Sequence, residues 1–464
     1  MNVPNIDGNV PGSFRDPSGF LFWQDGLIYR QVNIIYKENY DHLINSGLYD
    51  DLVNSRLLIP HEEISINYSR EESAYKILKP EQIPFISYPY EWCFSQLKDA
   101  ALTTLEVQKK ALQYGMILKD SSAYNIQFFK GIPVFIDTLS FEKYTEGDPW
   151  VAYKQFCQHF LAPLALMSYR DIQLNQLFRI FIDGVPLDLT SSLLPFRTRL
   201  KIFLLSHIHF HAKSQKYFAN KVLKNTINYK MGRLSLLGLI DNLESTLKKL
   251  HWKAKDTEWA DYYEDTNYST EAFQHKKELV AEFINDINPG NVWDLGANIG
   301  TFSRITSDKG IQTISFDVDP ACVEKNYLEC VKNRETNILP LLLDLVNPSP
   351  GIGWKHTERM SFIERGPADT VVALALIHHL AISNNLPIYK IADFFNDICN
   401  SLIIEFVPKN DSQVKRLLSS RKDIFSDYTQ EHFESQFAKY FNIQASIQIK
   451  NTERTLYQMK KKSI

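Results

Sequence analysis

The stretch that decides the fold is Val292-Trp-Asp-Leu-Gly-Ala-Asn-Ile-Gly300. It predicts a short apolar strand that ends in an acid, followed by a glycine-containing turn that leads into a helix. Glycine lets the backbone approach a ligand closely, and a helix N-terminus offers N–H groups that have no partner within the helix. The stretch therefore indicates a nucleoside-binding turn, and the segments after it must show which nucleoside fits.

Strand-like and helix-like segments alternate from Pro289 to the end of the chain. The predicted strands are Val292–Leu295, Thr313–Asp317, Ile338–Leu345, Thr370–Leu376, Leu402–Val407, Ile443–Ile449 and Thr455–Lys460. The predicted helices lie near Gly300–Lys309, Pro320–Lys332, Pro387–Cys399, Ser412–Arg421 and Gln430–Tyr440. Such alternation predicts an α/β fold with a parallel sheet covered on both faces. The last two strands have no helix between them, which predicts a closing hairpin with one antiparallel strand.

With this strand order, Asp294, Gly296 and Gly300 resemble the first glycine-rich motif of the class I S-adenosylmethionine-dependent methyltransferases. The resemblance begins at about Asp256 and implies a Rossmann-like sheet of seven strands with S-adenosylmethionine as the cofactor. Taken alone, the turn could also be an ordinary strand–helix connection. A dinucleotide oxidoreductase is a further alternative, but that fold usually has Gly-x-Gly-x-x-Gly and lacks the closing hairpin.

Two later acids match the same family. In the resemblance Asp317 accepts hydrogen bonds from both ribose hydroxyls, which suits a carboxylate because it only accepts hydrogen bonds when ionised. The alternative role, capping the helix that starts at Pro320, fits Asp319 better. Asp344 matches the position that binds the adenine amino group, with an apolar residue on each face of the ring. The resemblance places these residues at the donor: Asp294, Gly296, Ala297, Asn298, Gly300, Asp317, Val318, Asp344, Leu345, Leu374 and Ala375.

His378 and His379 follow the predicted strand Thr370–Leu376. In the family the end of this strand lies beside the transferred methyl group. A histidine with a pKa of about 6.5 can take a proton from a hydroxyl or amine acceptor, so both are candidate catalytic residues. Alternatively the pair packs structurally at the sheet edge, because methyl transfer needs mainly an in-line pose of the acceptor.

A second group of polar residues lies in the N-terminal half, where Asp120, Asn125 and Asp137 follow one another at spacings of five and twelve. This order resembles that of kinases, which use a catalytic Asp, an Asn and a magnesium-binding Asp. The resemblance implies an α+β kinase-like domain. If the domain is active, it would bind ATP and Mg²⁺, with Asn125 and Asp137 as the metal ligands.

The sequence also departs from the kinase pattern. Leu118-Lys119 replaces the usual His-Arg, and Thr138-Leu139 replaces the usual Phe-Gly. The region Gly12–Gly19 offers no convincing phosphate-binding loop, and Arg30 is the best placed substitute for the phosphate-binding lysine. The alternative is that the polar residues are turn and cap residues of a purely structural or acceptor-binding domain.

The length of 464 residues predicts two domains, placed at residues 1–240 and 241–464 with the junction between about 235 and 255. Strand-like runs are expected in the first part of the chain, followed by a helix near Glu91–Tyr114. The strand-like runs are Phe20–Trp23, Leu27–Tyr29, Tyr75–Leu78 and Pro84–Ser87. A net charge of −3 gives no sign of a nucleic-acid partner, and no apolar run is long enough to span a membrane. Five cysteines without paired spacing favour a reducing compartment, so we expect a cytoplasmic protein of unknown oligomeric state.

Together, the two halves resemble bacterial fused methyltransferases associated with nodulation and with cell-surface polysaccharides. The resemblance implies a small-molecule or glycan acceptor that the N-terminal domain selects or modifies. The sequence does not identify that acceptor. Its candidate contacts are the aromatic stretch Trp259–Tyr268 and the corner formed by His378 and His379.

Overall fold

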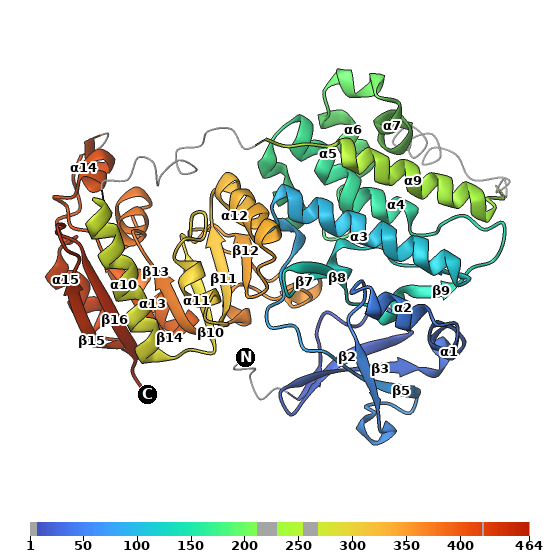
Figure 1. The fold of residues 1–464 in the computed structure, drawn as a ribbon, viewed down its shortest axis with the longest axis horizontal. Coiled ribbons are helices and arrows are strands. Elements are labelled where there is room, and N and C mark those ends of the chain that lie inside the picture. The colour runs from blue at the N-terminus through green and yellow to red at the C-terminus, as the bar shows by residue number, and fades with distance from the viewer. Residues whose placement is uncertain (1–6, 211–229, 254–267, 420–421, 464) are drawn as a thin grey trace. The chain divides into compact units, whose positions relative to one another are not determined.

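The computed structural model describes residues 7–210, 230–253, 268–419 and 422–463 (Figure 1). The chain forms two compact units. Among the described residues, the N-terminal unit comprises 7–210, 230–253 and Ile352–Arg359, and the C-terminal unit comprises 268–351, 360–419 and 422–463. The expected boundary at 240/241 would cut helix α9 (Arg233–Lys249), which packs on helix α3 of the N-terminal unit.

The C-terminal unit contains a seven-stranded sheet in the order β12-β11-β10-β13-β14-β16-β15. Strands β10 to β14 run parallel, and β16 is antiparallel to both β14 and β15. Figure 1 shows these strands in the yellow-to-red part of the chain. The strands are β10 (Asn291–Leu295), β11 (Gln312–Asp317), β12 (Ile338–Leu342), β13 (Ala368–Ala373), β14 (Cys399–Phe406), β15 (Phe441–Gln448) and β16 (Thr455–Lys461).

Helices accompany this sheet as the strand–helix alternation predicts, and the α/β class is confirmed. They are α10 (Thr270–Ile287), α11 (Ser303–Ser307), α12 (Pro320–Asn333), α13 (Ile388–Ile398), α14 (Ser412–Ser419) and α15 (Gln430–Phe437). Helix α10 was not predicted; its N-terminus is capped by the Ser269 side chain, which accepts the Ala272 N–H. Strands β12, β13 and β14 are buried almost throughout, which is typical of parallel strands covered on both faces.

The N-terminal unit begins with an antiparallel five-stranded sheet in the order β1-β2-β3-β5-β4. Its strands are β1 (Gly8–Asn9), β2 (Gly19–Gln24), β3 (Leu27–Asn33), β4 (His61–Ile64) and β5 (Ala74–Pro80). Helices α1 (Lys37–Asn45) and α2 (Leu48–Asn54) interrupt this region, and neither was predicted. The predicted strand Pro84–Ser87 is wrong: this proline-containing segment is irregular and precedes α3 (Phe94–Gln113).

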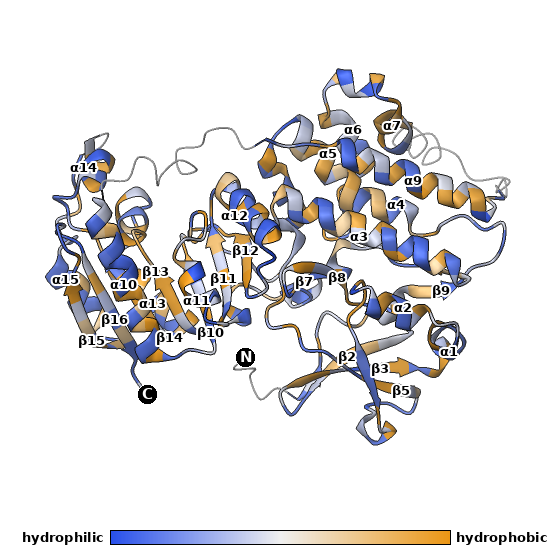
Figure 2. Ribbon diagram, in the orientation of Figure 1, coloured by the Kyte–Doolittle hydropathy of each residue, from blue (hydrophilic) through white to orange (hydrophobic). Residues whose placement is uncertain are grey.

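After α3 come two small strand pairs and a helical region. The pairs are β6 (Met116–Leu118) with β9 (Phe141–Lys143), and β7 (Ile126–Phe129) with β8 (Ile132–Phe135). The further helices are α4 (Tyr153–Phe156), α5 (Ala162–Tyr169), α6 (Leu187–Leu193), α7 (Ile202–Leu204) and α9. Figure 2 shows hydrophobic and hydrophilic residues alternating around α3 and α9, as expected of helices with one buried face.

All five cysteines are buried free thiols. None of the helices in the described parts of the chain combines the length and the apolar character that crossing a membrane requires.

Candidate functional site

The turn after β10 has the backbone that the glycine pattern predicts. Gly296, Asn298 and Gly300 all have left-handed backbones, with φ of +77°, +53° and +79°. A Cβ at Gly300 would lie 2.5 Å from Oδ1 of Asn326, so a side chain does not fit there. The N–H groups of Gly296 and Ala297 both donate to the Phe316 carbonyl at 2.9 Å, which fastens the turn to the end of β11.

Asp317 ends β11 and is buried beside this turn. Its Oδ2 accepts the Asn298 N–H at 2.7 Å, and its Oδ1 accepts the Asp319 N–H at 2.9 Å. Burial raises the pKa of Asp317 to about 6, although these backbone N–H groups act in the opposite direction. Asp319 caps helix α12 by accepting the Ala321 N–H, as the sequence indicates. Asp317 is therefore not used as the helix cap.

Asp294 lies beneath the turn, with 2% of its surface exposed. The Ser303 hydroxyl donates to its Oδ2 at 2.6 Å. Burial raises the pKa of Asp294 to about 7, and the charge of Asp317 adds to the rise. Asp294 is thus held by a residue of α11, the helix that follows the turn.

The residues expected around an adenine ring lie at the ends of β11 and β12. These strands pair in parallel with Asp317 opposite Leu342, so the residues after each strand emerge at the same edge of the sheet. Val318, next to the buried carboxylate of Asp317, is 59% exposed. Asp344 is exposed and accepts the Val346 N–H at 2.9 Å, while Leu345 is half-buried.

Leu374 and Ala375 follow β13, which ends at Ala373 and therefore earlier than predicted. Ala375 has a left-handed backbone with φ of +50°, and its N–H donates to Glu405 Oε2 at 2.7 Å. The Leu376 side chain lies 3.4 Å from the position of a Cβ at Gly296, so this loop contacts the glycine turn. Glu405 was not predicted as a site residue, although a single acid inside the apolar run Leu402–Val407 was a usable signal.

His378 and His379 are adjacent, with ring centroids 4.2 Å apart. Nδ1 of His378 is buried and has no hydrogen-bond partner among the described residues. Burial lowers the pKa of His379 to about 4 and that of His378 well below its usual value, and the charge of Arg454 contributes to both shifts. Both shifts favour the neutral form of the rings, and the candidate catalytic role of the two histidines stays a prediction.

In the N-terminal unit the structure brings the three predicted polar residues together. Asp120 Oδ1 accepts the Ser122 N–H at 2.9 Å and the Gln155 amide at 2.8 Å. The Asn125 amide donates to the Ser140 hydroxyl at 3.2 Å, and that hydroxyl donates to Asp137.

Arg30 also belongs to this cluster. Its Nη1 lies 2.5 Å from Asp137 Oδ1, and the pair is largely buried. Both carboxylate oxygens of Asp137 therefore have protein partners, Arg30 on one and Ser140 on the other. A role of Asn125 and Asp137 as magnesium ligands stays a prediction.

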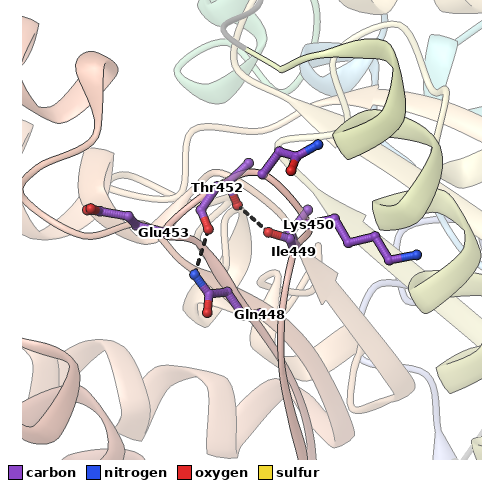
Figure 3. Close-up of a pocket in the computed structure, with 6 residues that line it drawn as sticks. Gln448, Ile449, Lys450, Thr452 and Glu453 are labelled. Carbon is purple, nitrogen blue, oxygen red and sulfur yellow. Dashed lines mark hydrogen bonds between the residues drawn. The ribbon is translucent and has the colours of Figure 1, made fainter.

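The aromatic stretch proposed as an acceptor contact lies mostly outside the described residues, which resume at Tyr268. A shallow surface pocket lies at the turn between β15 and β16 (Figure 3). Its lining is the single run Gln448–Glu453, where the Gln448 amide donates to the Thr452 carbonyl and the Thr452 hydroxyl to the Ile449 carbonyl. These polar groups serve the turn itself.

No protein-family model matches the chain. Solved structures similar to part of it include magnesium protoporphyrin IX methyltransferase (ChlM) from Synechocystis PCC 6803 with bound SAH. That structure is 15% identical, with a TM-score of 0.30, and the match covers 41% of this chain and 84% of that one. The bifunctional kinase-methyltransferase WbdD is 13% identical, with a TM-score of 0.29, and the match covers 45% of this chain and 43% of that one. Likenesses this low do not assign a function.

A comparison with curated sequences is much stronger. The chain is 35% identical over 462 residues to nodulation protein NoeA of Rhizobium meliloti (strain 1021). The match covers 97% of this chain and 95% of that protein. The chain therefore belongs to the NoeA family of nodulation proteins.

Proposed function

We propose that the C-terminal unit transfers a methyl group from S-adenosylmethionine to a small-molecule or glycan acceptor. The observation that carries the proposal is the meeting of a left-handed glycine turn with a buried carboxylate at the ends of β10 and β11. Gly296 is exposed at the start of the turn, whereas Gly300 is buried and packs against Asn326 with no room for a side chain. Each oxygen of Asp317 accepts one backbone N–H and keeps a second lone pair, with which it can accept a hydroxyl of a diol.

The residues present fit this donor. Asp317 would hold the ribose hydroxyls and Asp344 the adenine amino group, with Val318 and Leu345 against the ring. The exposed state of Val318 supports this role, because a flat apolar ligand would cover it. When bound, the donor supplies an electrophilic methyl group on its sulfonium.

The neutral imidazoles of His378 and His379 are suited to accept a hydrogen bond or a proton from the acceptor's hydroxyl or amine. A positively charged imidazole could not do so. Because each pKa lies far below neutrality, the rings are weak bases, and their main contribution would be orientation of the acceptor.

For the N-terminal unit, we propose acceptor selection as the function. Phosphoryl transfer needs the carboxylate of Asp137 to hold Mg²⁺, and Arg30 and Ser140 already engage both of its oxygens. The bifunctional kinase–methyltransferase is the alternative. It would require this ion pair to open when ATP and Mg²⁺ bind.

The donor site is tested by replacing Asp317. In Asp317→Ala and Asp317→Asn we expect the affinity for S-adenosylhomocysteine, measured by titration calorimetry, to fall by roughly a hundredfold, because two hydrogen bonds to a charged group are lost. Asp319→Ala is the matched control. It removes the cap of α12 but leaves the Asp317 carboxylate in place, so the affinity should stay close to that of the wild type. Wild-type affinity in both Asp317 variants would contradict the assignment.

A further inference from the structure

A network of buried charges lies at the ends of β14 and β16. The Lys276 ammonium donates to Glu405 Oε2 at 2.7 Å, with side-chain exposures of 3% and 0%. The Tyr268 hydroxyl donates to Glu405 Oε1, and Arg454 Nη1 lies 3.5 Å from the same oxygen. Arg454 also makes a bidentate pair with Asp411 at 2.7 and 3.0 Å. Two cations and two carboxylates thus meet in one buried cluster.

Within this cluster the ionised form of Glu405 is favoured. Burial alone would raise its pKa, but the charges of Lys276 and Arg454 outweigh burial and leave the pKa below its usual value. A buried ion pair is weak support for stability, because the cost of removing two charges from water often exceeds their attraction. The cluster therefore calls for a role other than holding the core together.

Glu405 reaches the donor site through the backbone. Its Oε2 accepts the N–H of Ala375, whose left-handed backbone is unfavourable for a residue with a Cβ. The neighbouring Leu376 side chain lies against Gly296, in the turn after β10. A hydrogen bond to a charged acceptor can hold Ala375 in this conformation and, through Leu376, hold the loop against the glycine turn.

Lys276 also contacts a residue next to the same turn. Its ammonium lies 4.9 Å from the ring centre of Phe302, which follows the turn and precedes α11. The Lys276–Glu405 pair therefore contacts both segments that border the proposed donor site: the turn before Phe302 and the loop at Ala375.

We infer that Glu405 is a positioning residue of the donor site: it fixes the loop Leu374–Leu376 against the glycine turn, with Lys276 and Arg454 holding its carboxylate in place. The inference rests on the proposed methyltransferase function. It assigns a role to an acid that does not itself meet the donor.

Glu405→Ala removes the acceptor of the Ala375 N–H. We expect the affinity for S-adenosylhomocysteine to fall about tenfold to a hundredfold, and the Ala375 amide to exchange hydrogen faster in the ligand-free full-length protein. Glu405→Gln keeps an oxygen that can accept this N–H, so it should recover part of the affinity and of the amide protection. A group that only supported the core would not show this rescue.

Lys276→Met combined with Glu405→Leu guards against misfolding, because it removes the pair without leaving one buried charge alone. This double variant should remain folded and still lose donor affinity. Phe437→Leu is the matched control: Phe437 lies in α15 and packs against Phe433 of the same helix and Phe395 of α13, so the substitution should lower the unfolding temperature without changing donor affinity.

Donor affinity within about twofold of the wild type in folded Glu405→Ala and in the double variant would overturn the inference. Failure of the wild type to bind S-adenosylhomocysteine would instead count against the proposed function. Amide exchange at Ala375 still decides the positioning role in that case: unchanged exchange in Glu405→Ala refutes it, and faster exchange supports it.

Discussion

The two neighbouring imidazoles couple proton binding to the stability of the C-terminal unit. Burial lowers the pKa of His379 to about 4, whereas in the unfolded chain it is near 6.5. The native state therefore prefers the neutral ring. This contribution to the free energy of unfolding is fully present above pH 6.5. It is lost as the pH falls towards 4, because the histidine then binds a proton in the unfolded chain but not in the native state.

We predict that His379→Gln flattens this pH dependence. Between pH 7 and 4 the wild type should lose about 3 kcal/mol of unfolding free energy more than the variant, as measured by urea unfolding at several pH values. Asp294, with its pKa raised to about 7, acts in the opposite sense: its contribution is present at low pH and is lost as the pH rises. The same urea unfolding series on Asp294→Asn separates the effect of Asp294 on the pH dependence of the unfolding free energy from that of His379. Parallel pH curves for His379→Gln and the wild type would refute the prediction.

Helix α9 packs on the N-terminal unit and belongs to it. Leu243 and Leu247 are fully buried, and Lys109 of α3 pairs with Glu244 at 2.5 Å and with Asp241 at 2.6 Å. We predict that Leu243→Ala costs about 2–5 kcal/mol in the unfolding of the N-terminal unit because it leaves a cavity under α9. Donor affinity should not change.

The control for this prediction is Asp241→Ala, since the Asp241 side chain is 67% exposed. Removing such a surface ion pair should cost at most about 1 kcal/mol. Equal destabilisation by the two substitutions would show that α9 is attached to the unit mainly by charge, contrary to its buried apolar face.

Much of the C-terminal sheet could be predicted strand by strand from the sequence, because buried parallel strands are continuous apolar runs. Strands β10 and β11 end at the predicted residues Leu295 and Asp317. Helix α10 was not predicted because a charged residue, Lys276, lies on its buried face and interrupts the apolar pattern. The hydrogen bond from the Ala375 N–H to the Glu405 carboxylate could not be predicted either, since it joins residues thirty positions apart and depends on the packed sheet.

The molecule as a whole contains two compact units with separate clusters of core residues. One cluster gathers around residues of α10, β10 and β14, and others lie around β2, β3 and α1 of the N-terminal unit. Because each unit buries its own apolar surface, the chain should unfold in two steps, and a ligand of one unit should shift mainly the step that belongs to it.

We predict that S-adenosylhomocysteine raises one of two transitions in scanning calorimetry of the full chain, and that ATP with Mg²⁺ raises neither. At a hundred times its Kd, a ligand adds about 2.7 kcal/mol to the unit it binds, which is readily seen as a shift in Tm. The absence of an ATP effect would follow from Arg30 and Ser140 occupying the oxygens of Asp137. A magnesium-dependent shift that disappears in Asp137→Ala would instead establish nucleotide binding and favour the bifunctional alternative. The Asp137→Ala control is decisive because non-specific binding of ATP would survive it, whereas a metal held by this carboxylate would not.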